Sequence, residues 1–203
     1  MASDGIADPL DGHHHEPIEH LDPLDALQHD HAFQLELCDL MEGLADSLPD
    51  GDIVIAAAIL PVLRRGVTGH MRFEEEQLFP LLRGHHTTMP QVKAVTTQLT
   101  REHEVDVEFL GEVADALEAF IGEGIVDNPE MLGYMLRFFF ESQRRHIEWE
   151  NNVLIPLARD VLTGEEMQVL RRALAASHGG RCNSRTFFNE YRRALSRRHA
   201  VGR

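Results

Sequence analysis

The sequence has little cysteine, no long apolar run and no basic leader. Its two cysteines, Cys38 and Cys182, are far apart in a chain of 203 residues, which excludes a disulfide framework and closely spaced thiolate sites. The longest apolar run, residues 53–63, contains Pro61 and is shorter than the ~20 residues that a membrane-spanning helix needs. No basic segment precedes an apolar one near the start, so no secretory signal is expected. We therefore expect a cytoplasmic protein that does not associate with a membrane.

Basic residues are scarce over most of the chain. Positions 1–170 hold 33 acidic and 10 basic residues, whereas positions 171–203 hold nine arginines and only Glu190 as an acid. The acidic part repels nucleic acid and anionic lipid, so we expect no nucleic-acid partner. We expect the basic tail to dock on the acidic body, within one chain or in a homodimer formed through the C-terminal extension. DNA binding by the tail is the alternative.

Helix-boundary signals predict six helices. Asp22, Asp52 and Asn128 each stand before a helix-forming segment, as N-cap residues do, and proline follows the first and the third. Thr163 and Glu166 form a capping box. The predicted helices cover residues 23–47, 53–83, 90–122, 129–160, 164–176 and 186–197.

Four long helices with short connections predict an all-α fold. The expected architecture is an up-down-up-down four-helix bundle with an internal helix-pair repeat and a short helical C-terminal extension. Pro61 and Pro80 are predicted to kink the second helix. We divide the chain into a His-rich N-terminal arm at 1–21, the bundle at 22–162, and short helices with a basic tail at 163–203.

An internal repeat contains the residues of greatest chemical interest. The pattern H-x-x-[FW]-E-x-x-x-L-[FI]-P-L begins at His70 and again, without gaps, at His146. It places Glu74 and Glu150 four residues after these histidines, on the same helix face. A single His-x-x-x-Glu pair is weak evidence in a chain with 13 histidines. The two pairs are significant because both lie within the same longer sequence pattern.

The other two long helices each offer a histidine preceded by an acid. Counting from the helix starts at ~1.5 Å per residue places His31, His70, His103 and His146 within one turn of each other. The two glutamates of the repeat then lie about one turn away. A lone buried histidine is usually a hydrogen-bonded core residue. Four in one layer with two carboxylates would be costly to bury without partners, so the pattern predicts a metal centre.

The donor types restrict the metal. Mixed imidazole and carboxylate donors suit iron, manganese or zinc, whereas copper(I), iron–sulfur clusters and calcium favour other ligands. Four imidazoles and two carboxylates do not saturate two six-coordinate ions. The predicted centre therefore keeps open positions, as a reactive site does.

The order His, His-x-x-x-Glu, His, His-x-x-x-Glu on four helices resembles the hemerythrin-like HHE cation-binding domain family over residues 22–160. The resemblance implies a non-heme di-iron centre, with manganese or zinc as possible substitutes. Oxygen-carrying hemerythrins place a further histidine four residues after the one on their third helix, where this chain has Val107, so reversible oxygen carriage is not expected. The implied metal ligands are His31, His70, Glu74, His103, His146 and Glu150.

Two classes of function stay open. The first is a di-iron protein that binds or reacts with dioxygen, nitric oxide or peroxide, for sensing or scavenging. The second is an enzyme that uses the same centre to decompose peroxide or to catalyse another iron-dependent oxidation. A weaker alternative is a metal-stabilised interaction module. The sequence does not decide whether the protein is an enzyme.

Residues near the motifs have simpler interpretations. Glu75, Glu76 and Glu148 are able to accept hydrogen bonds from ligand imidazoles, but we expect each to lie on a solvated helix face. The run Phe138-Phe139-Phe140 is expected in the core. Cys38, seven residues after His31, is expected to be a buried core thiol.

Overall fold

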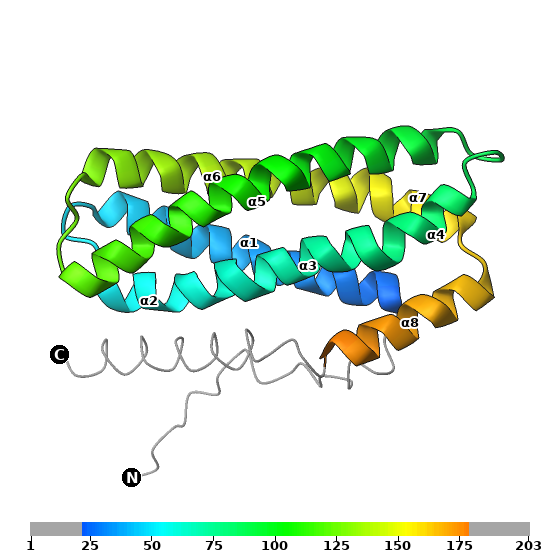
Figure 1. Cartoon of the computed structure of the whole chain (residues 1–203), viewed down its shortest axis with the longest axis horizontal. Helices are drawn as coiled ribbons and strands as arrows, with labels where there is room; N and C mark the ends of the chain where they lie inside the picture. Colours follow the sequence, from blue (N-terminus) through cyan, green and yellow to red (C-terminus); the bar gives the residue numbers. More distant parts are fainter. Residues whose placement is uncertain (1–21, 179–203) are drawn as a thin grey trace, which may run out of the picture.

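The computed structural model describes residues 22–178, and helices account for nearly all of them (Figure 1). The predicted arm at 1–21, the predicted helix at 186–197 and most of the basic tail lie outside the described residues. No strand occurs between residues 22 and 178. The elements are α1 (Pro23–Ser47), α2 (Ile53–Pro61), η2 (Val62–Val67), α3 (Thr68–Phe73), η3 (Glu74–Leu78), α4 (Phe79–Gly84), α5 (Gln91–Glu123), α6 (Pro129–Trp149), η4 (Glu150–Leu154), α7 (Ile155–Val161) and α8 (Gly164–His178).

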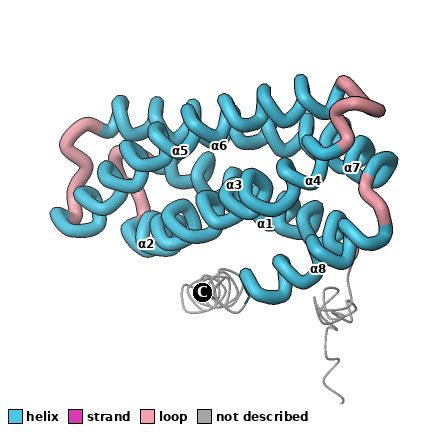
Figure 2. Tube along the Cα trace, turned by 45° about the vertical axis from the view of Figure 1, so that its right-hand side comes forward, coloured by secondary structure: helices cyan, strands magenta, loops and turns pink. Residues whose placement is uncertain are grey.

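These elements form a bundle of four long helical rods. The first rod is α1, the second runs without a break from α2 to α4, the third is α5, and the fourth runs from α6 to α7. The rods lie side by side along one long axis, and their connections are short (Figures 1 and 2). Helix α8 follows α7 and turns back beside α1. An all-helical bundle is therefore confirmed.

The helices begin at the predicted caps. The side chain of Asp22 accepts a hydrogen bond from the Leu24 amide at 3.0 Å, and Asp52 and Asn128 cap α2 and α6 in the same way. At α8 the Glu166 carboxylate accepts from the Thr163 amide at 2.8 Å, while Thr163 Oγ1 accepts from the Glu166 amide at 3.3 Å. Each cap satisfies a backbone amide that has no partner within its helix. The sequence predicted these starts because capping depends on local residues.

Helix α5 ends at a glycine with a left-handed backbone. Gly124 has φ of 76°, and its amide donates to the Phe120 carbonyl at 3.0 Å. This conformation carries no steric penalty for glycine, which lets the chain leave α5 and reach the Asn128 cap within a few residues.

Wider π-helical turns accompany the prolines inside the rods. Turn η3 ends just before Pro80, turn η4 ends just before Pro156, and η2 follows Pro61. In η3 and η4 the closing amide donates to the carbonyl of Glu74 or Glu150, five residues earlier. A proline removes one backbone donor and its ring clashes with the carbonyl four residues earlier, so the wider turn accommodates it without ending the helix. Both glutamates of the repeat therefore open a π-helical turn.

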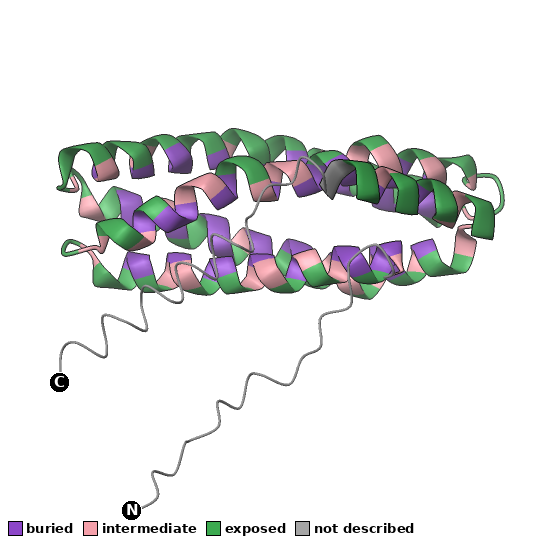
Figure 3. Cartoon of the chain, turned by 90° about the horizontal axis from the view of Figure 1, so that it is seen from below, coloured by how far each residue is buried: buried purple, intermediate pink, exposed green. Residues whose placement is uncertain are grey.

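The apolar core forms two clusters along the bundle. One includes Leu37, Leu63 and Phe139, and the other includes Leu24 and Phe79. Figure 3 shows the buried residues on the inward faces of the rods. Phe138 is 44% exposed, so the prediction that the whole phenylalanine run is in the core was wrong for this position. Cys38 is in the first cluster, as predicted, and burial raises the pKa of its thiol to about 12.

The second rod, Ile53–Gly84, is long and apolar enough to cross a membrane, judged by length and composition only. A core helix of a soluble bundle passes the same test. This rod contributes residues to both core clusters, and it also carries the buried polar side chains of His70 and Glu74.

Candidate metal centre

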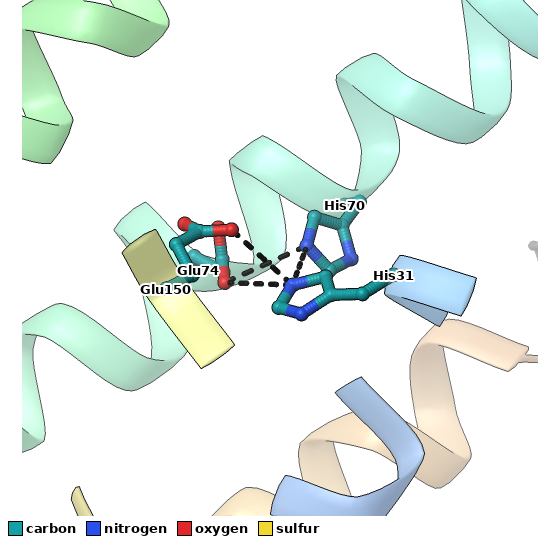
Figure 4. Close-up of side chains that lie close together, drawn as sticks. All are labelled: His31, His70, Glu74 and Glu150. Carbon is teal, nitrogen blue, oxygen red and sulfur yellow. Dashed lines mark hydrogen bonds and ion pairs between the residues drawn. The ribbon is translucent and has the colours of Figure 1, made fainter. Parts of the chain in front are cut away.

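Six buried polar side chains converge inside the bundle. They comprise one histidine from each rod and the two glutamates of the repeat, and none is more than 5% exposed. They fall into two groups whose potential ligand atoms all lie within 4.8 Å of one another. Figure 4 shows the first group, in which two imidazoles face two carboxylates. The groups are His31, His70, Glu74 and Glu150, and Glu74, His103, His146 and Glu150.

The histidines form two pairs with inward-facing Nε2 atoms. His31 Nε2 lies 3.0 Å from His70 Nε2, and His103 Nε2 lies 3.1 Å from His146 Nε2. The rings within each pair are inclined to one another, at 67° and 56°. Two nitrogens at this separation bring two lone pairs toward one point, which is how imidazoles of one metal site are arranged.

The two carboxylates lie between the histidine pairs. Glu74 has Oε1 3.5 Å from His70 Nε2 and Oε2 3.6 Å from His103 Nε2. Glu150 has Oε2 3.2 Å from His31 Nε2 and Oε1 3.1 Å from His146 Nε2. Each glutamate thus presents one oxygen to each pair. This is the arrangement expected of carboxylates that bridge two cations.

All four of these carboxylate oxygens are buried without a hydrogen-bond partner among the described residues. Burying an ionised carboxylate without compensation costs several kcal/mol. Two cations would satisfy these oxygens and the Nε2 lone pairs together. The donor set therefore fits a centre of two metal ions.

Hydrogen bonds from outside hold three of the rings, and an ion pair holds the fourth. His103 Nδ1 lies 3.1 Å from Glu75 Oε1, and His146 Nδ1 lies 2.9 Å from Glu102 Oε2. Such bonds fix the tautomer, because an Nδ1 that donates outward leaves the Nε2 lone pair free to face inward. A single proton on each ring, at Nδ1, is the form that binds metal.

The first histidine pair has different outer partners. His31 Nδ1 lies 2.8 Å from the amide oxygen of Asn151, and His70 Nδ1 lies 3.7 Å from Asp30 Oδ2. In the repeat, Asn151 occupies the position that corresponds to Glu75. The second pair is thus backed by two carboxylates, and the first by one carboxylate and one amide.

The charges within the centre raise the pKa of two histidines and lower the pKa of one glutamate. Burial disfavours the charged form of His70, but the carboxylates of Glu74 and Asp30 outweigh it and raise the pKa of His70 to about 10. The pKa of His146 is also raised, because Glu150 and Glu102 outweigh its burial. The pKa of Glu150 is lowered despite burial, because His146 and His31 face it. Without metal, protons therefore occupy the centre.

Apolar side chains enclose the centre on the glutamate side. Phe79 stacks on His103, with ring centroids 5.8 Å apart and planes inclined by 11°. Leu78 and Leu154, which follow the two glutamates by four residues, are fully buried. These contacts exclude water from that side and strengthen the electrostatic interactions within.

The structure brings together all six predicted ligand positions and corrects one prediction about their surroundings. Glu75 was expected on a solvated face, but it accepts a hydrogen bond from His103, while Glu76 and Glu148 are exposed as expected. Val107 is 45% exposed and does not face the centre. The buried position on this part of α5 is Asp106, 6% exposed, where burial raises the pKa of the carboxyl.

Sequence reasoning missed the outer partners Asp30, Glu102 and Asn151. A usable signal was present, because each of these residues adjoins a candidate ligand along the chain. A residue next to a ligand on a helix points toward the neighbouring rod, and there it reaches that rod's histidine.

Comparison with known proteins identifies the family. A model of the hemerythrin HHE cation-binding domain matches residues 22–158, which span the four rods and the candidate centre. The chain therefore belongs to the hemerythrin HHE cation-binding domain family. No curated protein and no solved structure matches the chain.

Proposed function

We propose that the protein is a di-iron protein that binds or reacts with a small oxidant or diatomic gas, either dioxygen, nitric oxide or peroxide, for sensing or scavenging. One observation carries the proposal: each of two shared carboxylates presents one oxygen to each of two histidine pairs. The up-down-up-down arrangement of the rods is part of this proposal, supported by connections that alternate between the two ends of the bundle (Figure 1). The proposed iron ligands are His31, His70, Glu74, His103, His146 and Glu150.

Iron is favoured by the donor set, with manganese or zinc as possible substitutes. Imidazole and carboxylate donors suit these metals, and six side chains leave positions open on two ions. When bound, iron supplies redox chemistry and a place for a small ligand. The chain's own residues orient the imidazoles through Nδ1, supply two shared carboxylates, and exclude water through Phe79 and its neighbours.

A second candidate function is peroxide decomposition. Asp106 favours it, because this carboxyl is buried three residues after His103 and burial raises its pKa. A raised pKa makes a carboxyl a better proton holder than an exposed aspartate, and a protonated carboxyl is able to donate that proton to a departing oxygen. Catalytic turnover of peroxide that falls in Asp106→Asn, with metal content unchanged, would favour the enzyme over the sensor.

The proposal is tested by metal content and by the absorption spectrum of the reduced and air-exposed protein. We expect about two iron ions per chain, since the ligand atoms form two groups. His70→Ala or His146→Ala should lose at least one ion and lower the melting temperature, because metal bound only by the folded state stabilises it. His86→Ala, an exposed loop position, is the matched control. Unchanged metal content in both site variants would contradict the assignment.

A further inference from the structure

Two buried glutamines lie one helical turn from the histidine layer. Gln34 follows His31 by three residues on α1, and Gln143 precedes His146 by three residues on α6. A spacing of three places each glutamine on the same helix face as its histidine. Glu150 follows His146, so the glutamines lie on the other side of the histidine layer from the shared carboxylates. They are 3% and 2% exposed.

The two glutamines form a pair that leaves one acceptor free. Gln143 Nε2 donates to Gln34 Oε1 at 3.0 Å, whereas Gln143 Oε1 is buried without a hydrogen-bond partner among the described residues. The third buried polar residue at this level, Asp106 on α5, has Ser142 as a hydrogen-bond partner. An unpaired buried acceptor lowers stability, and leucine would pack better against the adjoining apolar cluster. A bound ligand that donates a hydrogen bond to Gln143 Oε1 would explain why this position carries an amide and not an apolar side chain.

Among the described residues, the glutamine layer holds a buried polar atom without a partner on this side of the histidines. Beyond the two glutamates the described interior is mainly apolar, with Leu78, Leu99 and Leu154 fully buried, and the buried Thr96 hydroxyl there already donates to the Val92 carbonyl. A small molecule held in the centre would therefore meet a hydrogen-bonding side chain in the glutamine layer.

We propose that Gln143, held in place by Gln34, accepts a hydrogen bond from a small ligand that carries a proton, of the hydroxide or hydroperoxide class, bound in the metal centre. The inference rests on the proposed function. Gln34 fixes the orientation of the amide, because it takes a hydrogen from Gln143 Nε2 and leaves the oxygen free. The pair therefore favours ligands with a proton over anions without one.

The test compares two anions of equal charge and equal valence-electron count, only one of which carries a hydrogen. Azide has no proton, whereas hydrogencyanamide is isoelectronic with it and carries an N–H donor. Each is titrated spectrophotometrically into the full-length, iron-loaded, air-oxidised protein, and dissociation constants are compared within one buffer. In Gln143→Leu we expect hydrogencyanamide to bind about fivefold more weakly while azide binding is unchanged or tighter, since one hydrogen bond is lost.

Two further variants separate this role from a structural one. Thr96→Val also removes a buried polar group, one whose hydroxyl donates to the Val92 carbonyl at 3.0 Å, and should leave both affinities unchanged. Gln34→Leu frees Gln143 to rotate its NH₂ group toward the ligand, so azide should bind more tightly and discrimination should fall.

Equal weakening of both anions in Gln143→Leu would overturn the inference and leave the proposed function intact. Failure of the unmodified protein to bind iron, or to bind either anion once loaded, would overturn the proposed function and the inference with it.

Discussion

At the scale of single residues, the candidate centre depends on side chains that neighbour one ligand along the chain and support another in space. Glu102 adjoins His103 and supports His146, while Glu75 adjoins Glu74 and supports His103. Each outer carboxylate therefore supports a histidine on a different rod from the one that carries the carboxylate itself. A substitution at an outer residue should therefore change the metal affinity without removing any metal ligand.

Glu102→Gln and Glu75→Gln test this dependence. An amide oxygen still accepts from Nδ1 but makes the imidazole a poorer electron donor, so each variant should bind iron ~10- to 100-fold more weakly. Glu148→Gln, an exposed position on α6, is the control. Affinity is measured by competition with a coloured chelator. Equal affinities in all three variants would show that the outer carboxylates do not tune the centre.

The amide at Asn151 makes the two halves of the centre unequal. It supports His31, whereas the corresponding Glu75 supports His103. A carboxylate partner raises the donor strength of an imidazole more than an amide does. The two metal positions should therefore differ in affinity, with the position between His103 and His146 the tighter.

At the scale of helical elements, the π-helical turns place both shared glutamates. Each turn begins at the glutamate and ends two residues before a proline of the repeat, Pro80 or Pro156. A wider turn adds one residue and changes which side chains face inward on either side of it. The proline prevents a return to the regular α-helical hydrogen bond.

Pro80→Ala and Pro156→Ala test the role of these turns. Either variant restores a backbone donor that is able to bond four residues back, which favours a regular helix over the turn that positions the glutamate. We expect the fold to persist by circular dichroism while iron dissociates several-fold faster. Pro61→Ala changes the same second rod away from the glutamates and should leave dissociation unchanged. Similar iron dissociation rates in all three variants would show that the turns do not affect metal binding.

The sequence predicted helix ends and ligand positions better than helix faces. Asp22, Asn128 and Thr163 cap as expected because capping is local. The inward face of α5 was not predictable, since positions three and four residues after His103 both satisfy a helical period. The structure buries Asp106 and exposes Val107. Glu75 was assigned to solvent because its partner, His103, belongs to another rod.

At the scale of the whole molecule, protons and metal compete for the same interior. The folded-state pKa of His70 is about 10, above the ordinary value of 6.5, so the folded metal-free protein binds more protons than the unfolded chain between these values. The resulting stabilisation is fully present below pH 6.5 and is lost as pH rises through 10. Bound metal replaces the protons and removes this loss.

Thermal unfolding across that pH window tests the competition. The melting temperature of chelator-treated protein should fall as pH rises from 6.5 toward 10, while that of the iron-loaded protein should change little. The difference between the two melting temperatures should therefore increase as the pH rises. In His70→Ala without metal the fall should be smaller. Parallel curves for the metal-free and metal-loaded protein would contradict proton–metal exchange at these rings.

The pairing of ligands across the bundle bears on the origin of the chain. His31, His70 and Glu74 come from the first two rods, and His103, His146 and Glu150 come in the same order from the last two. Asp30 and Glu102 each support a histidine of their own half, while Glu75 and Asn151 each support one of the other half. Two copies of one ancestral helical hairpin, related by a two-fold axis, would supply every one of these positions. Gene duplication and fusion would then have freed each copy to diverge, and the difference between Glu75 and Asn151 would be one result of that divergence.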